Sequence, residues 1–302
     1  MDGPIDRRAP EGPVAFVGLG NMGSGMAANL AAHGVVVRAF DLDPGAVRRA
    51  AEAGCTPVAS AAEAAAGAAA FITMLPAGEA VAAVWREAAF PVLRPGALVV
   101  DCSTIDLATT RALAGEAEAR GLVPVDAPVS GGIAAAAAGT LTFMVGATDE
   151  GFERVQPLLG HMGRAVLRAG GHGAGQAAKL ANNLLLAATM VATCEALLLA
   201  RKLGLDPRAF YEIAARSSGQ SWSLTSYCPL PGVGPESPAD RGYQGGFATR
   251  LMVKDLRLAL AAARDAGALT PMGERAAALY EAFAAEPERA RLDFSAIIQA
   301  LA

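Results

Sequence analysis

The 302-residue chain contains very little lysine. Of its 25 cationic side chains only Lys179, Lys202 and Lys254 are lysines, so the other 22 are arginines. A lysine can lose its proton near neutral pH when its surroundings disfavour the cation, whereas an arginine stays charged. Lys179 and Lys254 are therefore candidates for proton transfer or ligand binding. Lys202 lies beside Arg201 at an expected helix end and is interpreted as a surface residue.

The sequence also lacks the patterns of several protein classes. Its four cysteines have neither CxxC nor paired Cys/His spacing, which argues against a zinc site and a disulfide framework. A reducing, cytoplasmic location is expected. The net charge of -4 comes without a block of like charges, so neither nucleic acid nor an anionic membrane is an expected partner.

Long apolar runs are scarce as well. The first residues are polar and rich in proline, unlike a secretory signal, and we expect a flexible tail over residues 1–12. The stretch from Leu184 to Ala200 is apolar but is interrupted by Glu195 and preceded by two asparagines. It is predicted to be a long buried helix rather than a membrane span.

Short apolar strands alternate with alanine-rich helical segments up to about residue 171, and the rest of the chain has helical patterns. The prediction is an α/β Rossmann-type N-terminal domain with a mostly parallel sheet over residues 13–171. An all-α C-terminal domain over residues 172–302 follows, joined by a long helix. Residues 227–246, rich in Pro and Gly, are predicted to form either a functional loop or a mobile one, and their aromatic residues favour an ordered loop.

A glycine-rich turn follows the first strand and opens the first helix, as a dinucleotide fingerprint requires. It is a G-x-G-x-x-G motif, made of Gly18, Leu19, Gly20, Asn21, Met22 and Gly23. The glycines permit a tight turn, a close approach of backbone to pyrophosphate and close helix packing. Asp41 ends the next strand, where a carboxylate binds the ribose hydroxyls and repels a 2′-phosphate. The pattern predicts NAD rather than NADP.

Three motifs together resemble the β-hydroxyacid dehydrogenase family. The first is the glycine fingerprint, the second is Asp126-Ala127-Pro128-Val129-Ser130-Gly131-Gly132, and the third is the spacing of Gly173, Gly175, Lys179 and Asn183. Within the family, the residues around Trp222, Pro229 to Val233 and Tyr243 to Phe247 are most similar to the 3-hydroxyisobutyrate dehydrogenases. Gly25 departs from the family pattern, which commonly has proline there.

The resemblance implies NAD-dependent oxidation of a short β-hydroxy acid to its semialdehyde. It also implies that Leu75, Pro76, Thr104 and Lys254 contact NAD, and that the chain forms a homodimer or homotetramer. For 3-hydroxyisobutyrate the product would be methylmalonate semialdehyde, a step of valine catabolism.

The chemistry of such a reaction needs a carboxylate anchor and a proton acceptor. Ser130, Gly131 and Gly132 offer a hydroxyl and unobstructed N–H groups for a carboxylate, with a plain turn as the alternative. Lys179 and Asn183 are four residues apart on one predicted helix face, so both would reach one ligand. Lys179 is predicted to be the general acid/base and Asn183 to orient the substrate. Trp222 and Phe247 are predicted either to wall the substrate pocket or to belong to the core.

Other functions remain open at this point. A sibling enzyme with the same apparatus would act on L-serine, tartronate semialdehyde or another short β-hydroxy acid. A non-catalytic NAD-binding sensor would keep the fold without the chemistry, and the presence of both Lys179 and Asn183 argues against it. An imine-reducing relative would tend to replace that lysine.

Overall fold

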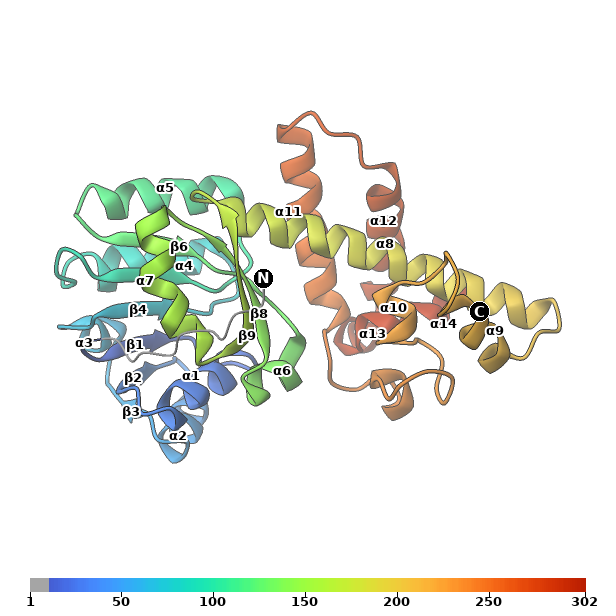
Figure 1. Cartoon of the computed structure of the whole chain (residues 1–302), viewed down its shortest axis with the longest axis horizontal. Coiled ribbons are helices and arrows are strands. Elements are labelled where there is room, and N and C mark those ends of the chain that lie inside the picture. Colours follow the sequence, from blue (N-terminus) through green and yellow to red (C-terminus); the bar gives the residue numbers. More distant parts are fainter. Residues whose placement is uncertain (1–10) are drawn as a thin grey trace. The chain divides into compact units, whose positions relative to one another are not determined.

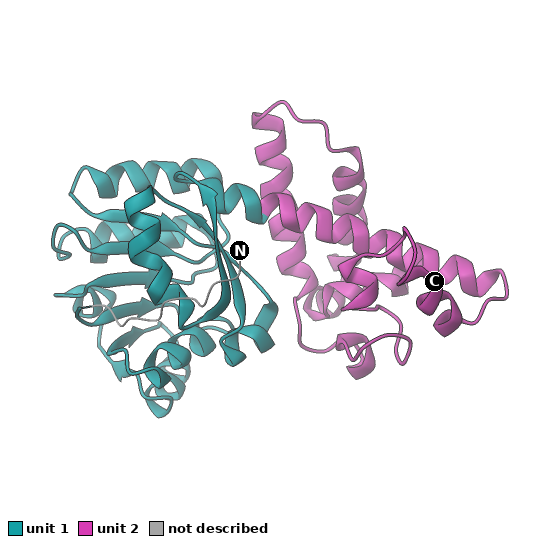
Figure 2. Cartoon of the chain, viewed as in Figure 1, with its two compact units in different colours: residues 1–179 teal, residues 180–302 magenta. Residues whose placement is uncertain are grey.

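The computed structural model describes residues 11–302, and the chain forms two compact units (Figure 2). The first unit is Met1–Lys179 and the second is Leu180–Ala302. Most of the predicted tail, residues 1–10, lies outside the described residues.

The first unit is built on one nine-stranded sheet, coloured blue to green in Figure 1. Its order is β3-β2-β1-β4-β5-β6-β8-β7, with β9 also paired to β8. The strands are β1 (Val14–Val17), β2 (Val37–Phe40), β3 (Thr56–Pro57), β4 (Ala70–Thr73), β5 (Leu98–Asp101), β6 (Val123–Asp126), β7 (Val129–Ser130), β8 (Leu141–Gly146) and β9 (Gly163–Gly170). The first six are parallel, whereas β8 is antiparallel to β6 and β7. This confirms a mostly parallel sheet.

Helices connect these strands. They are α1 (Gly23–Ala32), α2 (Pro44–Glu52), α3 (Ala61–Ala65), α4 (Gly78–Val84), the π-helix η1 (Trp85–Ala89), α5 (Leu107–Glu118), α6 (Gly132–Ala138) and α7 (Asp149–Gly160). Two separate clusters of buried apolar side chains accompany the sheet, one including Phe16 and Ile72 and the other Phe71 and Val99. Since neighbours along a strand point to opposite faces, both faces of the sheet are covered, as a Rossmann-type fold requires.

The second unit is helical. It contains most of α8 (Ala174–Lys202), then α9 (Pro207–Ala214), α10 (Trp222–Thr225), the 3₁₀ helix η2 (Pro238–Arg241), α11 (Thr249–Asp265), α12 (Pro271–Ala284), α13 (Pro287–Arg291), the 3₁₀ helix η3 (Phe294–Ile297) and α14 (Ile298–Leu301). Its core includes Met190, Leu256 and Tyr280, all fully buried. The two helices α11 and α12 pack against each other within this unit.

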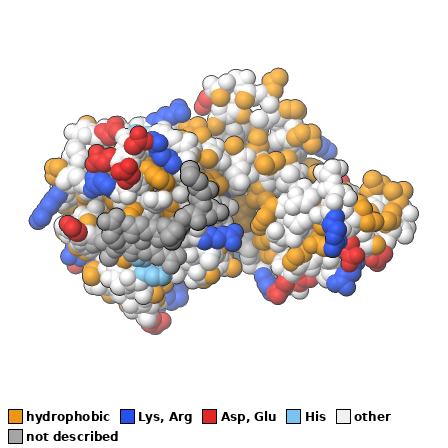
Figure 3. All heavy atoms as spheres, viewed as in Figure 1, with side chains coloured by type: hydrophobic (Ala, Val, Ile, Leu, Met, Phe, Trp, Pro, Cys, Tyr) orange, Lys and Arg blue, Asp and Glu red, His pale blue; other side chains and the backbone are white. Residues whose placement is uncertain are grey.

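Helix α8 is the one helix of residues 11–302 that is long and apolar enough to cross a membrane. Half of its most apolar 18-residue stretch is buried. Ala187, Met190 and Cys194 of α8 are fully buried in the core of the second unit. That packing is typical of the core helix of a soluble protein. On the face shown in Figure 3, acidic side chains gather in places with basic ones beside them, and neither sign covers a large part of the face.

Candidate active site

The glycine fingerprint forms the connection between β1 and α1 that its spacing predicts. Gly18 has a φ of 98°, and a Cβ there would collide with the backbone carbonyl of Met74 at the end of β4. A Cβ on Gly23 would collide with the carbonyl of Gly18. Gly20 differs, because a Cβ there would meet no atom within 4 Å. The loop is therefore closely packed at Gly18 and Gly23 and open at Gly20. An open backbone at the middle glycine leaves room for a pyrophosphate.

Asp41 lies beside this loop, at the end of β2. Its Oδ2 accepts a hydrogen bond from the Leu19 N–H at 2.6 Å, and its Oδ1 accepts one from the Asp43 N–H at 2.8 Å. Arg38 points elsewhere, since it donates to the carbonyl of Ala66. A carboxylate therefore stands at the glycine loop without an adjacent cation from β2. This arrangement suits ribose hydroxyls and opposes a 2′-phosphate.

The connections after β4 and β5 are joined by hydrogen bonds. The Leu75 N–H donates to Ser103 Oγ at 2.8 Å, and Ser103 Oγ donates in turn to Asp101 Oδ1 at 2.6 Å. Leu75 and Pro76 follow β4, and Thr104 follows Ser103. The structure therefore brings these three predicted NAD contacts to the same edge of the sheet as the glycine loop, where parallel strands end.

The predicted carboxylate anchor lies between β6 and α6. Ser130 ends the two-residue strand β7, and Gly131 and Gly132 then lead into α6. Gly132 has a φ of 72°, and a Cβ there would meet open space. Its backbone is therefore accessible, and the left-handed conformation favours glycine.

The start of α8 is anchored to the sheet by Asp126 at the end of β6. Asp126 Oδ1 accepts from the Gly173 N–H at 2.7 Å, and Oδ2 accepts from the Gln176 N–H at 3.0 Å. The Gln176 side chain donates to the Ser103 carbonyl at 2.7 Å. Lys179 follows one turn later and is only 8% exposed. The predicted base therefore lies one turn after residues that are hydrogen-bonded to Asp126 at the end of β6 and to Ser103 just after β5.

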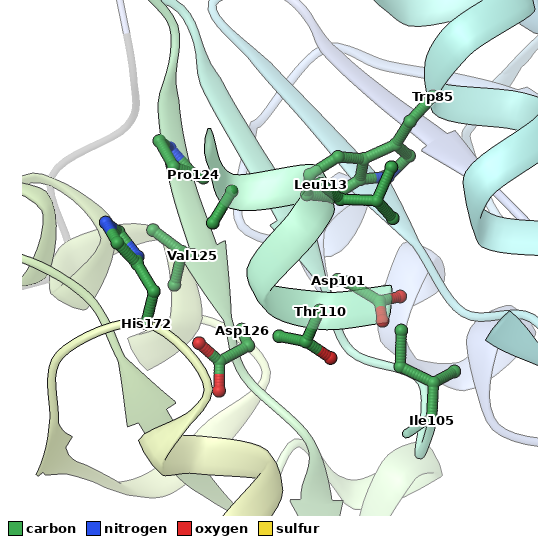
Figure 4. A pocket seen from close by; sticks show the side chains of 10 residues that line it. Trp85, Asp101, Ile105, Thr110, Leu113, Pro124, Val125, Asp126 and His172 are labelled. Carbon is green, nitrogen blue, oxygen red and sulfur yellow. The ribbon is translucent and has the colours of Figure 1, made fainter. Parts of the chain in front are cut away.

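A narrow cavity lies in this unit beside the same strand ends (Figure 4). Asp101, Asp126 and His172 are among its lining residues, together with Trp85, Ile105 and Thr110. Burial raises the pKa of Asp101 to about 6, against the opposing effect of its hydrogen bonds from Ser103 and Thr73. Burial also raises the pKa of Asp126, although the N–H groups of Gly173 and Gln176 oppose it. Neither carboxyl was a predicted site residue.

In the second unit Asn183 is held by Asp255, which is not among the predicted site residues. Its Nδ2 donates to Asp255 Oδ2 at 2.6 Å, and Lys254 Nζ lies 3.4 Å from Asp255 Oδ1. Asp255 is buried on α11, 72 residues from Asn183 along the chain. Its only sequence signal is its place next to Lys254. The structure thus brings Asn183 and Lys254 together through one carboxylate.

Trp222 and Phe247 belong to an aromatic cluster of the same unit. Trp222 is 51% exposed and stacks on Tyr227 with ring centroids 4.8 Å apart. The Tyr227 hydroxyl donates to Asp293 Oδ2 at 2.9 Å, and the Phe247 N–H donates to the same oxygen at 2.7 Å. Phe247 packs against the core, whereas Trp222 is half exposed. Hydrogen bonds within residues 227–246, including that from the Tyr243 hydroxyl to the Pro229 carbonyl, tie the predicted loop together.

Comparison with known proteins decides the family. Residues 13–171 match the NAD binding domain of 6-phosphogluconate dehydrogenase, and residues 173–301 match the NAD-binding domain of NADP-dependent 3-hydroxyisobutyrate dehydrogenase. The chain is 48% identical over 287 residues to 3-hydroxyisobutyrate dehydrogenase from Pseudomonas aeruginosa, covering 94% of this chain and 96% of that protein. The chain belongs to the β-hydroxyacid dehydrogenase family.

Two further relatives bear on substrate. An NAD-dependent L-serine dehydrogenase from Pseudomonas aeruginosa is 46% identical over 269 residues, covering 88% of this chain and 90% of that protein. A solved structure of Mycobacterium tuberculosis 3-hydroxyisobutyrate dehydrogenase with L-serine has a TM-score of 0.92 and 44% identity, covering 96% of this chain and 99% of that one. This β-hydroxyacid dehydrogenase is thus an oxidoreductase with a nicotinamide dinucleotide as cofactor.

Proposed function

We propose that this β-hydroxyacid dehydrogenase oxidises 3-hydroxyisobutyrate to methylmalonate semialdehyde with NAD, and that Lys179 is the general acid/base. The observation that carries the proposal is the placement of Lys179, buried on a helix turn fixed to the ends of β5 and β6. Gln176, one turn earlier, supplies one of those ties. Asn183, one turn later, has its amide held by Asp255. The substrate name follows from the Pseudomonas aeruginosa relative at 48% identity.

In this proposal each residue has a separate task. NAD is held by the glycine loop, Asp41, Leu75, Pro76, Thr104 and Lys254. When bound, it accepts a hydride from the carbinol carbon.

The substrate carboxylate is bound by Ser130, Gly131 and Gly132 through the hydroxyl and backbone N–H groups. Asn183 orients the substrate hydroxyl. Lys179 Nζ takes the hydroxyl proton as the alcohol is oxidised, and returns it in the reverse reaction.

Preference for NAD over NADP rests on Asp41. Its carboxylate accepts a hydrogen bond from the Leu19 N–H of the glycine loop. A 2′-phosphate bound beside it would meet a like charge at close range. Trp222, which is half exposed, is proposed to wall the substrate pocket, and Phe247 is proposed to support it from the core. A cytoplasmic location and a place in valine catabolism complete the proposal.

The second candidate function is oxidation of L-serine. It is favoured by the relative at 46% identity that is an NAD-dependent L-serine dehydrogenase, and by the structural neighbour that contains L-serine. Both substrates are short β-hydroxy acids, so the same proton acceptor and carboxylate anchor would serve either one.

A substrate panel tests the proposal. Purified wild-type protein is assayed with 3-hydroxyisobutyrate, L-serine and glycerate, each with NAD and with NADP. The expected result is the highest kcat/KM for 3-hydroxyisobutyrate with NAD. A higher kcat/KM for L-serine would favour the second candidate, a preference for NADP would contradict the role of Asp41, and NAD binding without any turnover would indicate a sensor.

We also infer a homodimer or homotetramer formed through the second unit. Three leucines at or just after α8, namely Leu185, Leu199 and Leu203, are between 58% and 70% exposed. Burying such side chains in a subunit contact is favourable. The molar mass of the protein in solution, measured by light scattering, tests this inference, and a monomer at micromolar concentration would contradict it.

A further inference from the structure

Asp101 is a buried carboxyl that the proposed reaction does not use. It ends β5 and is only 3% exposed. Its two oxygens have different environments. Oδ1 accepts three hydrogen bonds, from Thr73 Oγ1 at 2.8 Å, Ser103 Oγ at 2.6 Å and the Ser103 N–H at 3.2 Å. Oδ2 is buried without a hydrogen-bond partner among residues 11–302.

Each donor to Oδ1 belongs to a segment that leads to a predicted NAD contact. Thr73 ends β4, two residues before Leu75, and also accepts a hydrogen bond from Trp85 Nε1 at 3.2 Å. Ser103 precedes Thr104 and accepts the Leu75 N–H. One carboxylate oxygen therefore joins the connection after β4 to the connection after β5.

The same network reaches the helix that carries the proposed base. The Ser103 carbonyl accepts from Gln176 Nε2 at 2.7 Å, and Gln176 Oε1 accepts from the Ile105 N–H at 3.2 Å. Ser103 therefore forms hydrogen bonds through its side chain, its N–H and its carbonyl. Because Ser103 and Ile105 flank Thr104, the backbone position of Thr104 is fixed from both sides.

Stability alone does not account for this arrangement. Transfer of a carboxylate from water into a protein interior is unfavourable, and burial raises the pKa of Asp101, so its ionised form opposes folding at neutral pH. An apolar residue of similar volume would avoid that cost at the end of a buried strand. What such a residue could not supply is an acceptor for three donors from two connections.

We propose that Asp101 is a positioning residue of the dinucleotide site, whose Oδ1 holds the connections after β4 and β5 in the arrangement that binds NAD. This inference rests on the proposed function, because the contacts of Leu75, Pro76 and Thr104 with NAD are part of it. Asp101 itself touches neither substrate nor cofactor. Its loss acts through Ser103 and Leu75.

The test compares two substitutions at the same position. Asp101→Asn keeps an oxygen that accepts the three donors, and its Kd for NADH is expected to stay within about threefold of wild type. Asp101→Leu leaves the donors of Thr73 and Ser103 buried without an acceptor, and its Kd is expected to rise about tenfold or more. With NAD as substrate, the loss in Asp101→Leu is expected in KM for NAD more than in kcat.

A matched control separates positioning from general destabilisation. Val155→Ala removes two methyl groups from a fully buried side chain of α7, which contributes nothing to the network. This variant should melt at a lower temperature than wild type while binding NADH normally. If Val155→Ala weakens NADH binding as much as Asp101→Leu does, or if Asp101→Leu binds NADH like wild type, the inference is overturned.

Ser103→Ala keeps the inference testable if Asp101→Leu does not fold. It removes only the hydroxyl between Asp101 and the Leu75 N–H, so Kd for NADH should rise in the same direction, by about tenfold. An unchanged Kd would contradict the inference. Failure of the wild-type protein to bind NADH would instead contradict the proposed function, and the two failures are therefore distinguishable.

Discussion

At the scale of single residues, the site depends on carboxylates that hold backbone or amide groups in place. Asp41 holds the glycine loop, Asp126 holds the first turn of α8, and Asp255 holds Asn183. Hydrogen bonds to a charged acceptor are stronger than neutral ones, and each of these accepts at least one of 2.7 Å or less. Lys179 and Asn183 therefore extend from a framework fixed by acidic side chains.

Asp41 offers a prediction about cofactor choice. Asp41→Asn keeps an oxygen for the Leu19 N–H but removes the charge that would repel a 2′-phosphate. We expect the ratio of kcat/KM for NAD to that for NADP to fall by about tenfold, which corresponds to about 1.4 kcal/mol. Steady-state kinetics with both cofactors measure the ratio. The exposed Asp43 provides the control, since Asp43→Asn should leave the ratio almost unchanged. An unaltered ratio in Asp41→Asn would show that another group discriminates.

At the scale of elements, the parts predictable from the sequence are those whose signals are local. The long helix predicted over Leu184 to Ala200 is present as part of α8 (Ala174–Lys202), because its apolar pattern is long and local. The glycine fingerprint and Asp41 were equally predictable from the sequence, because their spacing within one β-α-β unit is fixed. Asp101, Asp126 and Asp255 were missed as site residues. Asp126 and Asp255 meet partners 47 and 72 positions away, and periodicity says nothing about such contacts.

Gly25 of α1, which departs from the family pattern, has a packing role. Gly25 faces α6, where a Cβ would lie 2.9 Å from the backbone of Ala136 and Ala137. Asn29, one turn later, donates to the Ala136 carbonyl at 2.9 Å. The absence of a side chain at Gly25 therefore lets the two helices approach closely. The sequence alone did not indicate this contact.

Gly25→Ala tests the role of that close approach. Alanine favours helix, but its methyl group would push α1 away from α6, and overpacking of this kind typically costs about 1 to 3 kcal/mol. We expect a lower melting temperature and weaker NADH binding, since the glycine loop leads directly into α1. Gly115→Ala on α5 is the matched control, because a Cβ there meets no atom within 4 Å and should be tolerated or stabilising. Equal melting temperatures for Gly25→Ala and wild type would contradict the packing account.

At the scale of the whole molecule, buried carboxyls are distributed over both units. Burial raises the pKa values of Asp101 and Asp126 in the first unit and of Asp293 in the second. A raised pKa means that the folded chain binds the proton more tightly than the unfolded chain does. The stability gained from that proton is fully present below the unfolded pKa and is lost as pH rises through the folded pKa.

The pH dependence of unfolding follows from these shifts. For Asp101, whose pKa rises from 3.8 to about 6, stability should increase as pH falls from 8 to 5, by roughly 1 kcal/mol. Melting temperatures measured at several pH values should therefore rise by a few degrees over this range. Asp101→Asn removes the titrating group, so its melting temperature should vary less with pH. A wild-type protein that melts at a lower temperature at pH 5.5 than at pH 8 would contradict this prediction.

The central claim is that Lys179 carries the proton in catalysis, and the most direct measurement is turnover of Lys179→Ala with 3-hydroxyisobutyrate and NAD. Lys202→Ala is the matched control, because Lys202 is an exposed lysine at the end of the same helix. We expect Lys179→Ala to bind NADH normally while its kcat falls by about a thousandfold, the contribution typical of a general base. The kcat of Lys202→Ala should match that of wild type. A kcat for Lys179→Ala within tenfold of wild type would contradict the account.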